Sequence, residues 1–379
     1  MNQTALLHIV ERLERLVTRL PEKIRRPVLR ELTPLKELFL EQRPPRFLFV
    51  GSSKMPMPQI INALFASGAQ EQKNVSLMPV HRWIDWNISG HGTISILDAR
   101  DASDSASAQV EEDLERQPAD IIFVFDDEDS DFEKSAPAGS ASLMLRLQHP
   151  FSGTLGDAKV IGVAFGSENR TKQLEERLKT QPAIRDRLLQ VIQFTEMPSA
   201  EGQGFLSFLA EELPNPAKIE MIRISRDREA QHHVAQMLIK STTAICTAIG
   251  AQPIPLADLP ILTSLQVVMV SGIMYISGRE RSLRAATEFI TALGANVGAG
   301  MLLREGARAI LKFFPGWGNV VCGMVAGAGT YAIGRAASAF FIGGVSLKDA
   351  RRKYLADREK ASHKPHWLHG SMRASKQIE

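Results

Sequence analysis

The 379-residue chain has few cysteines, few aromatic residues and none of the common enzyme motifs. Its two cysteines, Cys246 and Cys322, lie in apolar surroundings and lack the paired spacing of a zinc site or a disulfide framework. No G-x-S-x-G elbow, H-E-x-x-H pair, Cys-x-x-Cys set or G-x-G-x-x-G loop occurs in a usable context. The sequence therefore predicts no catalytic residues of these classes, no metal site and no cofactor.

Charge and hydropathy exclude two further classes of protein. The net charge of +3 is too small to indicate a nucleic-acid partner. The first 20 residues, MNQTALLHIVERLERLVTRL, interleave charged with apolar side chains and contain no continuous apolar segment. Such a start is unlike a secretory signal, so we expect a cytoplasmic protein. An apolar content of 44% with 23% charged residues is that of a folded protein.

Residues 1–45 predict an N-terminal helical hairpin. Leu6, Val10, Leu13 and Val17 recur at helical spacing, and a second helix is expected to end before the two prolines at 44–45. We expect this hairpin to pack on the domain that follows. The alternative is a separate helix that binds a membrane surface or a partner.

Residues 46–215 predict an α/β domain with a doubly wound sheet. Short apolar runs alternate with polar helical segments, as parallel sheets require. The expected strands are 46–51, 93–99, 120–126, 159–166 and 188–195, and the expected helices are 57–66, 108–117, 138–147, 170–179 and 202–212. A ligand site in such a fold lies at the carboxyl ends of the strands.

The first strand-to-helix loop of this domain has the context of a phosphate loop without its chemistry. Counted from Gly51, the pattern G-x-x-x-x-G-K-[S/T] places Pro56, Met57 and Pro58 where a glycine, a lysine and a hydroxyl residue belong. Proline has no N–H and methionine has no charge, so both kinds of phosphate contact are missing. Lys54 is the cation in this loop, three positions early. We predict that the loop does not bind a nucleoside triphosphate with normal affinity.

The stretch RFLFVGSSKMPMPQIINALF resembles the first strand, loop and helix of Era-like small GTPases, with residues 62–64 in the places of the family's Asn-Ala-Leu. ISILDARDAS resembles the next GTPase element, in which Asp98 is kept and Asp101 replaces the glycine. KVIGVAFGSEN lies where the guanine-reading motif follows its strand, and there Glu168 is the residue that could stand in for the base-binding acid. The resemblance implies a P-loop GTPase-type sheet whose nucleotide motifs are degenerate, that is, a pseudo-GTPase.

Residues 216–360 predict a second domain, all-helical and rich in glycine and alanine. IGAQPIPLADLPILTSLQVVMVSGIMYISG and FFPGWGNVVCGMVAGAGTYAIGRAASAFF resemble a bacterial helical domain of unknown function that often follows Era-like GTPase domains. The resemblance implies association with the membrane or with a GTPase partner, and it supplies no catalytic residues. Residues 361–379 are expected to form a flexible tail.

Two uncharged stretches of this helical domain are long enough to reach across a bilayer. Each has about 20 residues, between 258 and 279 and between 312 and 335, and a helix of that length spans a hydrocarbon core of about 30 Å. With Pro260, Gln266 and the PGWGN segment at 315–319, these stretches fit buried helices of a compact bundle, or a hairpin that inserts reversibly, about as well as permanent membrane spans. Glycines four residues apart in GANVG (294–298) and GMVAG (323–327) predict close helix–helix packing.

Together these features predict a non-catalytic scaffold. It would bind a protein partner, either a paralogous GTPase or a second copy of itself, and associate with the inner membrane surface and its lipids through the C-terminal helices. One alternative is an atypical NTPase that uses Lys54, Asp98 and Glu168. The other is a soluble, self-associating structural protein.

Overall fold

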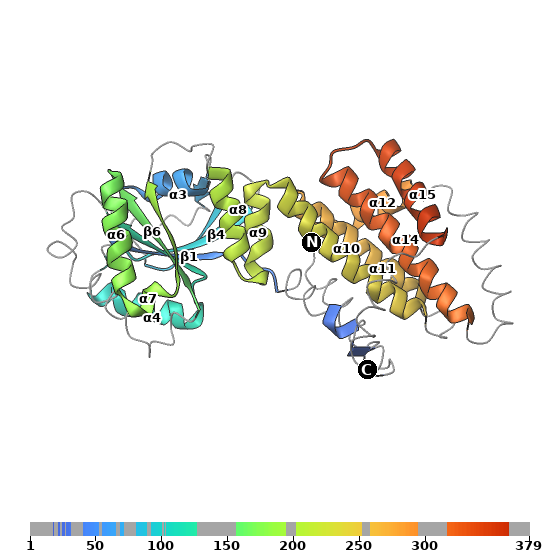
Figure 1. Cartoon of the computed structure of the whole chain (residues 1–379), viewed down its shortest axis with the longest axis horizontal. Helices are drawn as coiled ribbons and strands as arrows, with labels where there is room; N and C mark the ends of the chain where they lie inside the picture. Colours follow the sequence, from blue (N-terminus) through green and yellow to red (C-terminus); the bar gives the residue numbers. More distant parts are fainter. Residues whose placement is uncertain are drawn as a thin grey trace. The chain divides into compact units, whose positions relative to one another are not determined.

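The computed structural model divides the chain into two units, which are described separately (Figure 1). The first unit is Gln42–Asp227 and the second is Arg228–Glu379 together with Met1–Glu41. Within them the structure describes residues 41–52, 55–65, 69–71, 81–88, 92–100, 102, 104–126, 157–194, 202–251, 258–294 and 317–363, together with 18, 22, 25, 26 and 28–31.

The first unit, here called the α/β unit, is built on a seven-stranded sheet of order β2-β3-β4-β1-β5-β6-β7. The strands are β1 (Arg46–Ser52), β2 (Ala69–Glu71), β3 (Trp83–Ile88), β4 (Gly92–Asp98), β5 (Ile121–Asp126), β6 (Lys159–Phe165) and β7 (Leu188–Phe194). Strands β4, β1, β5, β6 and β7 pair in parallel, whereas β2 pairs antiparallel with β3, and β3 with β4. This is an α/β fold with a mixed, mostly parallel sheet.

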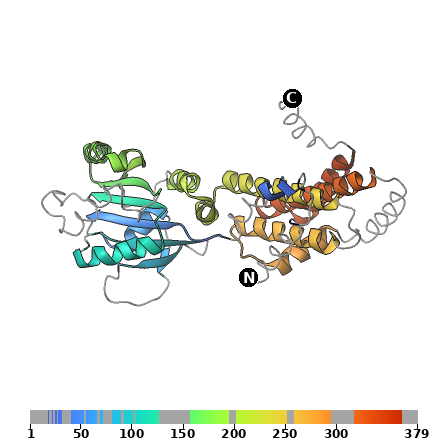
Figure 2. The same cartoon turned by 90° about the horizontal axis from the view of Figure 1, so that it is seen from below.

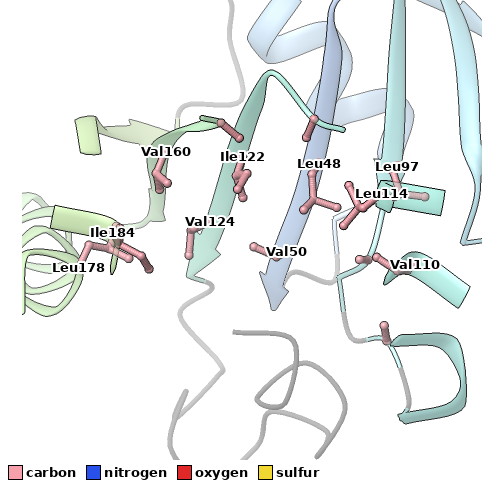
Figure 3. Close-up of a cluster of buried hydrophobic side chains, with 14 of the residues drawn as sticks. Leu48, Val50, Leu97, Val110, Leu114, Ile122, Val124, Val160, Leu178 and Ile184 are labelled. Carbon is pink, nitrogen blue, oxygen red and sulfur yellow. The ribbon is translucent and has the colours of Figure 1, made fainter. Parts of the chain in front are cut away.

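Helices α4 (Asp104–Arg116), α6 (Glu168–Thr180) and α7 (Pro182–Arg185) cover one face of this sheet (Figure 2). Figure 3 shows the aliphatic core between them, in which Leu48 and Val50 of β1 lie among side chains from the neighbouring strands and these helices. Val110 and Leu114 of α4 belong to this core. Because successive strand residues point to opposite faces, the residues that alternate with Leu48 and Val50 line the other side.

That other side of the sheet is a layer of phenylalanines. Phe47 and Phe49 of β1 pack against Phe123 of β5, with ring centroids 5.6 and 5.3 Å apart. Helix α3 (Met57–Phe65) adds Phe65, which stacks on Phe47 at 5.0 Å. The layer continues through Phe125, Phe165 and Phe194 at the carboxyl ends of their strands. Edge-to-face and tilted ring pairs of this kind stabilise a core beyond the burial of their area.

The sequence-based elements of this unit are largely confirmed. The predicted strands appear as β1, β4, β5, β6 and β7, and the predicted helices appear as α3, α4, α6 and α8 (Gly202–Glu212). The helix expected at 138–147 lies outside the described residues. The antiparallel strands β2 and β3 and the short helix α7 were not predicted.

The boundary between the two regions differs from the one expected at residues 215/216. Helix α9 (Asn215–Ser225) belongs to the α/β unit, where it packs on α8 and on β4. The buried Glu220 of α9 accepts hydrogen bonds from Gln42 Nε2 at 2.7 Å and from the backbone N–H of Thr93 at 3.4 Å. These contacts fix α9 to the sheet, so the helical unit begins at Arg228.

The helical unit contains α10 (Arg228–Gly250), α11 (Asp258–Ile276), α12 (Leu283–Leu293), α14 (Trp317–Phe341) and α15 (Leu347–His363). Helix α14 packs along α10 and also contacts α11 and α15 (Figure 2). Cys246 of α10 is buried in this unit, and burial raises the pKa of its thiol to about 12. It is therefore a core residue and not a reactive thiol. Residues 361–363 of the expected flexible tail belong to α15, and the rest of that tail lies outside the described residues.

Two described residues of the N-terminal segment, Val28 and Glu31, pack within the helical unit. Val28 is buried in a cluster with Ile245, Cys246 and Ile249 of α10. Glu31 accepts a hydrogen bond from the hydroxyl of Ser241 at 2.6 Å. The expectation that this segment packs on the domain that follows it in sequence is thus wrong for Val28 and Glu31. Of the rest of the expected hairpin, the structure describes 18, 22, 25, 26, 29, 30 and 41–45, and the remaining residues lie outside the described part of the chain.

The long apolar stretches of this unit contribute to its core. Met269, Val270 and Ile273 of α11 and Ala332 and Ala336 of α14 are each fully buried. Over the described residues, none of the helices is both long enough and apolar enough to cross a membrane.

Close packing of α14 on α10 at glycines is confirmed for the GMVAG segment. A Cβ added at Gly323 would lie 2.8 Å from the carbonyl oxygen of Thr247, and one at Gly327 would lie 2.1 Å from the hydroxyl oxygen of the same residue. Such distances leave no room for a methyl group, so the helix backbones depend on glycine here.

We expect alanine substitutions at two glycines of α14 to have opposite effects. Gly323→Ala should lower the free energy of unfolding by about 1–2 kcal/mol, because the methyl group meets backbone atoms of α10. Gly329→Ala should raise it by about 0.5–1 kcal/mol, because a Cβ there has open space and alanine favours the helix. Urea denaturation of both variants measures the difference. Equal effects of the two substitutions would contradict the packing described.

Candidate functional site

The order of the strands identifies one edge of the sheet as the candidate site. From β1 the chain first adds strands on one side, ending with β4, and then continues on the other side with β5. In open α/β sheets, ligands bind outside the carboxyl ends of the strands where the strand order reverses. Here that place is the carboxyl end of β1 and its neighbours, with Gly51, Asp98 and Asp126.

Gly51 is held against the backbone of β5 in a conformation that favours glycine. Its φ is +96°, and a Cβ at this position would lie 2.2 Å from the carbonyl oxygen of Phe125. Non-glycine residues rarely adopt such a φ, and none would fit this contact. The first glycine of the degenerate loop is therefore required by the sheet itself, whether or not a ligand binds.

The N-terminus of α3 offers few donors to a phosphate. Pro58, in its first turn, has no N–H. The N–H groups of Gln59 and Ile60 both turn back to the carbonyl oxygen of Pro56, at 3.0 and 3.3 Å. A helix N-terminus binds anions through the N–H groups of its first turn, which have no partner within the helix. The bond from Ile60 is the ordinary first bond of the helix. Of the donors that a helix N-terminus leaves over, Pro56 and Pro58 have none, and that of Gln59 is bonded to Pro56.

An arginine lies between the loop and the end of β4. Arg100 donates from Nε to Oδ1 and from Nη2 to Oδ2 of Asp98, both at 2.9 Å. Its Nη1 donates to the carbonyl oxygen of Met55 at 3.0 Å, and its guanidinium lies 5.6 Å from the ring centroid of Phe125. The side chain is only 7% exposed. One buried cation thus joins the loop, β4 and β5.

These contacts change the electrostatics of the site. Both carboxylate oxygens of Asp98 accept hydrogen bonds from Arg100, so the negative charge of Asp98 is already balanced within the chain. The Met55 carbonyl points toward the arginine, whereas a phosphate loop turns successive N–H groups inward. The carboxyl ends of β1 and β4 therefore already hold a positive charge, the guanidinium of Arg100. The carbonyl oxygen of Met55 is directed at this guanidinium.

A second acid, Asp126, ends β5 on the other side of β1. It pairs in register with Ser52, and its side chain is 3% exposed. Oδ2 of Asp126 lies 3.7 Å from Nη1 of Arg177 on α6. Both acids at this edge are thus accompanied by an arginine of the same unit.

Glu168 does not reach this corner. It begins α6 after β6, and β5 separates β6 from β1 in the sheet. Its carboxylate pairs with Lys172 one turn along the helix at 2.9 Å, and this hydrogen bond lowers the pKa of Glu168. Glu168 thus forms an exposed pair within one helix.

The structure brings together only part of the predicted constellation. Gly51, Asp98 and the Pro56–Pro58 segment lie at one strand edge, and Glu168 lies away from it. Lys54 is outside the described residues, and so is Asp101. Arg100 was missed by sequence reasoning, although its position two residues after the acid of the ILDAR segment was the available signal.

No metal centre is present in the described part of the chain, where no three His, Cys, Asp or Glu side chains are grouped to hold an ion.

A scan of protein-family models finds none that matches this chain, and a search of curated proteins finds none that is significantly similar. The functional assignment consequently depends on the residues at the carboxyl ends of β1 and its neighbouring strands.

Proposed function

We propose that the α/β unit is a GTPase-like domain that does not bind nucleotide and serves as a scaffold for a protein partner. The observation that carries this proposal is the Arg100 contact with Asp98 and Met55. A GTPase keeps the acid at this strand end for a metal ion and turns the loop N–H groups to the phosphates. In this chain Arg100 binds Asp98, and the carbonyl oxygen of Met55 faces the carboxyl ends of β1 and β4 where a phosphate loop presents N–H groups.

The prolines of the loop support the same proposal independently. Without an N–H at Pro56 or Pro58, and with that of Gln59 bonded to the carbonyl oxygen of Pro56, the helix end has little capacity for an anion. A domain that loses its ligand still keeps the surfaces by which its relatives associate, because fold and site are separable. A paralogous GTPase or a second copy of this chain is the partner we propose.

The proposal also assigns the helical unit to the inner membrane surface. Its support is the resemblance of the C-terminal segments and the basic residues of α15, of which Lys348, Arg352 and Lys353 are exposed. Surface contact of this kind does not require a helix that spans the bilayer.

We expect Arg100→Ala to destabilise the α/β unit by about 1–2 kcal/mol, since it removes charge-assisted hydrogen bonds to a half-exposed carboxylate. The exposed pair of Arg116 with Glu112 provides the control, and Arg116→Ala should change stability by less than about 0.5 kcal/mol. Neither GTP nor GDP with magnesium should raise the melting temperature of the wild type or of either variant.

Thermal melts with and without nucleotide measure these effects. If GTP instead stabilised the wild type, and Lys54→Ala removed the effect, the chain would be an atypical nucleotide-binding protein, and the scaffold proposal would be wrong.

A further inference from the structure

The two edges of the seven-stranded sheet differ in length and in charge. Strand β2 forms one edge and has three residues, the last of which is the acid Glu71. Strand β7 forms the other edge and has seven residues, LLQVIQF, with no charge, no proline and no glycine. Proteins protect exposed edges with short strands, charges or prolines, because a row of unpaired N–H and C=O groups pairs readily with another strand. The β2 edge has two of these three protections, whereas β7 has none of them.

The outer side of β7 is open in the part of the chain that the structure describes. There β6 is the strand that pairs with β7, and β6 and α6 are the elements that pack most extensively on it. Residues 188–192 of β7 are half-buried and Gln193 is exposed, whereas all of β6 after Lys159 is buried. A register shift interrupts the ladder to β6 at Leu189, so residues 190–194 form a regular strand with one open side.

The sequence of β7 is compatible with pairing to a copy of itself. A two-fold axis perpendicular to the sheet makes two copies of β7 antiparallel and keeps their faces on the same sides. One residue then lies opposite its own copy, and each of its neighbours lies opposite a residue of the same face. Because LLQVIQF holds no charge, no like charges meet within the strands in any such register. Val191 and Ile192 are β-branched, and such residues stabilise cross-strand pairs.

Helix α6 adds charge complementarity beside the same edge. It packs on both β6 and β7 and so lies over the last two strands. With strands about 4.8 Å apart, joining two sheets at β7 would place α6 and its copy about 10 Å apart and antiparallel, which is the ordinary spacing of packed helices. Helix α6 has acidic Glu168 in its first turn and basic Arg177 and Lys179 in its last turn. The acidic end of each helix would thus lie toward the basic end of the other.

We propose that β7 is a docking edge whose partner is a second copy of this chain, held by antiparallel pairing of β7 with β7. The two sheets then form one continuous sheet, with both α6 helices on the same face. This inference rests on the proposed function, because it names the surface and the partner of that scaffold. A second copy fits better than an unrelated strand because the edge and the helix beside it are both self-complementary.

Sedimentation equilibrium of the full chain tests the proposal. The wild type should be a dimer at about 10 μM, and Gln193→Lys should raise the dissociation constant at least about tenfold, because the two-fold axis brings two lysines to the edge. Gln193 is exposed, so the variant should keep the fold, which circular dichroism checks. Gln117→Lys is the matched control. It makes the same change at an exposed residue just after α4, which packs over β1 and β4, and it should leave the dissociation constant unchanged.

Hydrogen exchange gives a second readout that needs no variant. Backbone N–H groups on the outer side of β7 exchange freely in a monomer and are protected when a second strand pairs with them. Protection of residues 188–194 should therefore increase when the wild type is concentrated from below to above its dissociation constant.

Three results would overturn the proposal: a wild type that stays monomeric at about 100 μM, a dimer that both lysine substitutions affect equally, or a dimer without added protection at β7. Melts with nucleotide test the scaffold function separately. Stabilisation by GTP would contradict that function, whereas dimerisation weakened by Gln193→Lys and not by Gln117→Lys would still establish the β7 edge.

Discussion

Replacing Gly51 with alanine is expected to destabilise the α/β unit by about 3 kcal/mol or more. The positive φ of Gly51 strains any residue with a Cβ, and that Cβ would lie 2.2 Å from the carbonyl oxygen of Phe125. Phe125 is fully buried among the phenylalanines of the sheet, so β5 cannot move aside without disturbing that layer. We expect a fall in melting temperature of about 10 °C for a unit of this size.

Gly204 provides the matched control for this substitution. It lies in α8 of the same unit, and a Cβ there would meet nothing within 4 Å. Gly204→Ala should leave the melting temperature unchanged or raise it slightly, because alanine favours the helix. A Gly51→Ala protein as stable as the wild type would show that the loop does not leave β1 with the geometry described.

The second large effect is expected from Asp120→Asn, which should lower the free energy of unfolding of the α/β unit by about 3 kcal/mol. Asp120 is 5% exposed and accepts two hydrogen bonds from the guanidinium of Arg43, both at 2.6 Å. It also accepts the N–H of Arg46, at the start of β1, at 2.9 Å. An asparagine has one acceptor oxygen and no charge, so it leaves Arg43 without a counter-charge at a half-buried position.

Glu112→Gln is the corresponding change in an exposed pair. Glu112 pairs with Arg116 at 2.5 Å, and their side chains are 60% and 70% exposed. Loss of this pair should change stability by less than about 0.5 kcal/mol. Urea denaturation followed by circular dichroism compares the two variants. If both substitutions lowered the free energy of unfolding by the same small amount, Asp120 would not hold the start of β1 as the structure describes.

Much of the α/β unit could be predicted because its central parallel strands are buried on both faces. Strands such as β5, whose residues are all buried, appear in the sequence as continuous apolar runs between polar helices. Strand β3 was missed because it is exposed in part and carries Asp85 and Asn87 among its apolar residues. Its alternation of residue types was present but weak beside the runs of the central strands.

The composition of the site could be predicted, but the contact that decides it could not. The sequence places Pro56, Pro58 and Asp98 by comparison with a known pattern. The sequence does not show that Arg100 folds back onto Asp98 and also reaches Met55, because these residues meet only when β1 and β4 pair. The boundary after α9 could not be predicted for the same reason. Glu220 of α9 contacts Thr93 and Gln42 only in the folded unit.

The most direct test of the central claim is a calorimetric titration of the full chain with GTP and GDP in the presence of magnesium. The arginine-filled corner predicts no binding heat at about millimolar nucleotide, for the wild type and for Lys54→Ala alike. Binding at micromolar nucleotide that Lys54→Ala abolishes would contradict it. That result would mean that the SSKMPMP segment forms a working phosphate site despite its prolines.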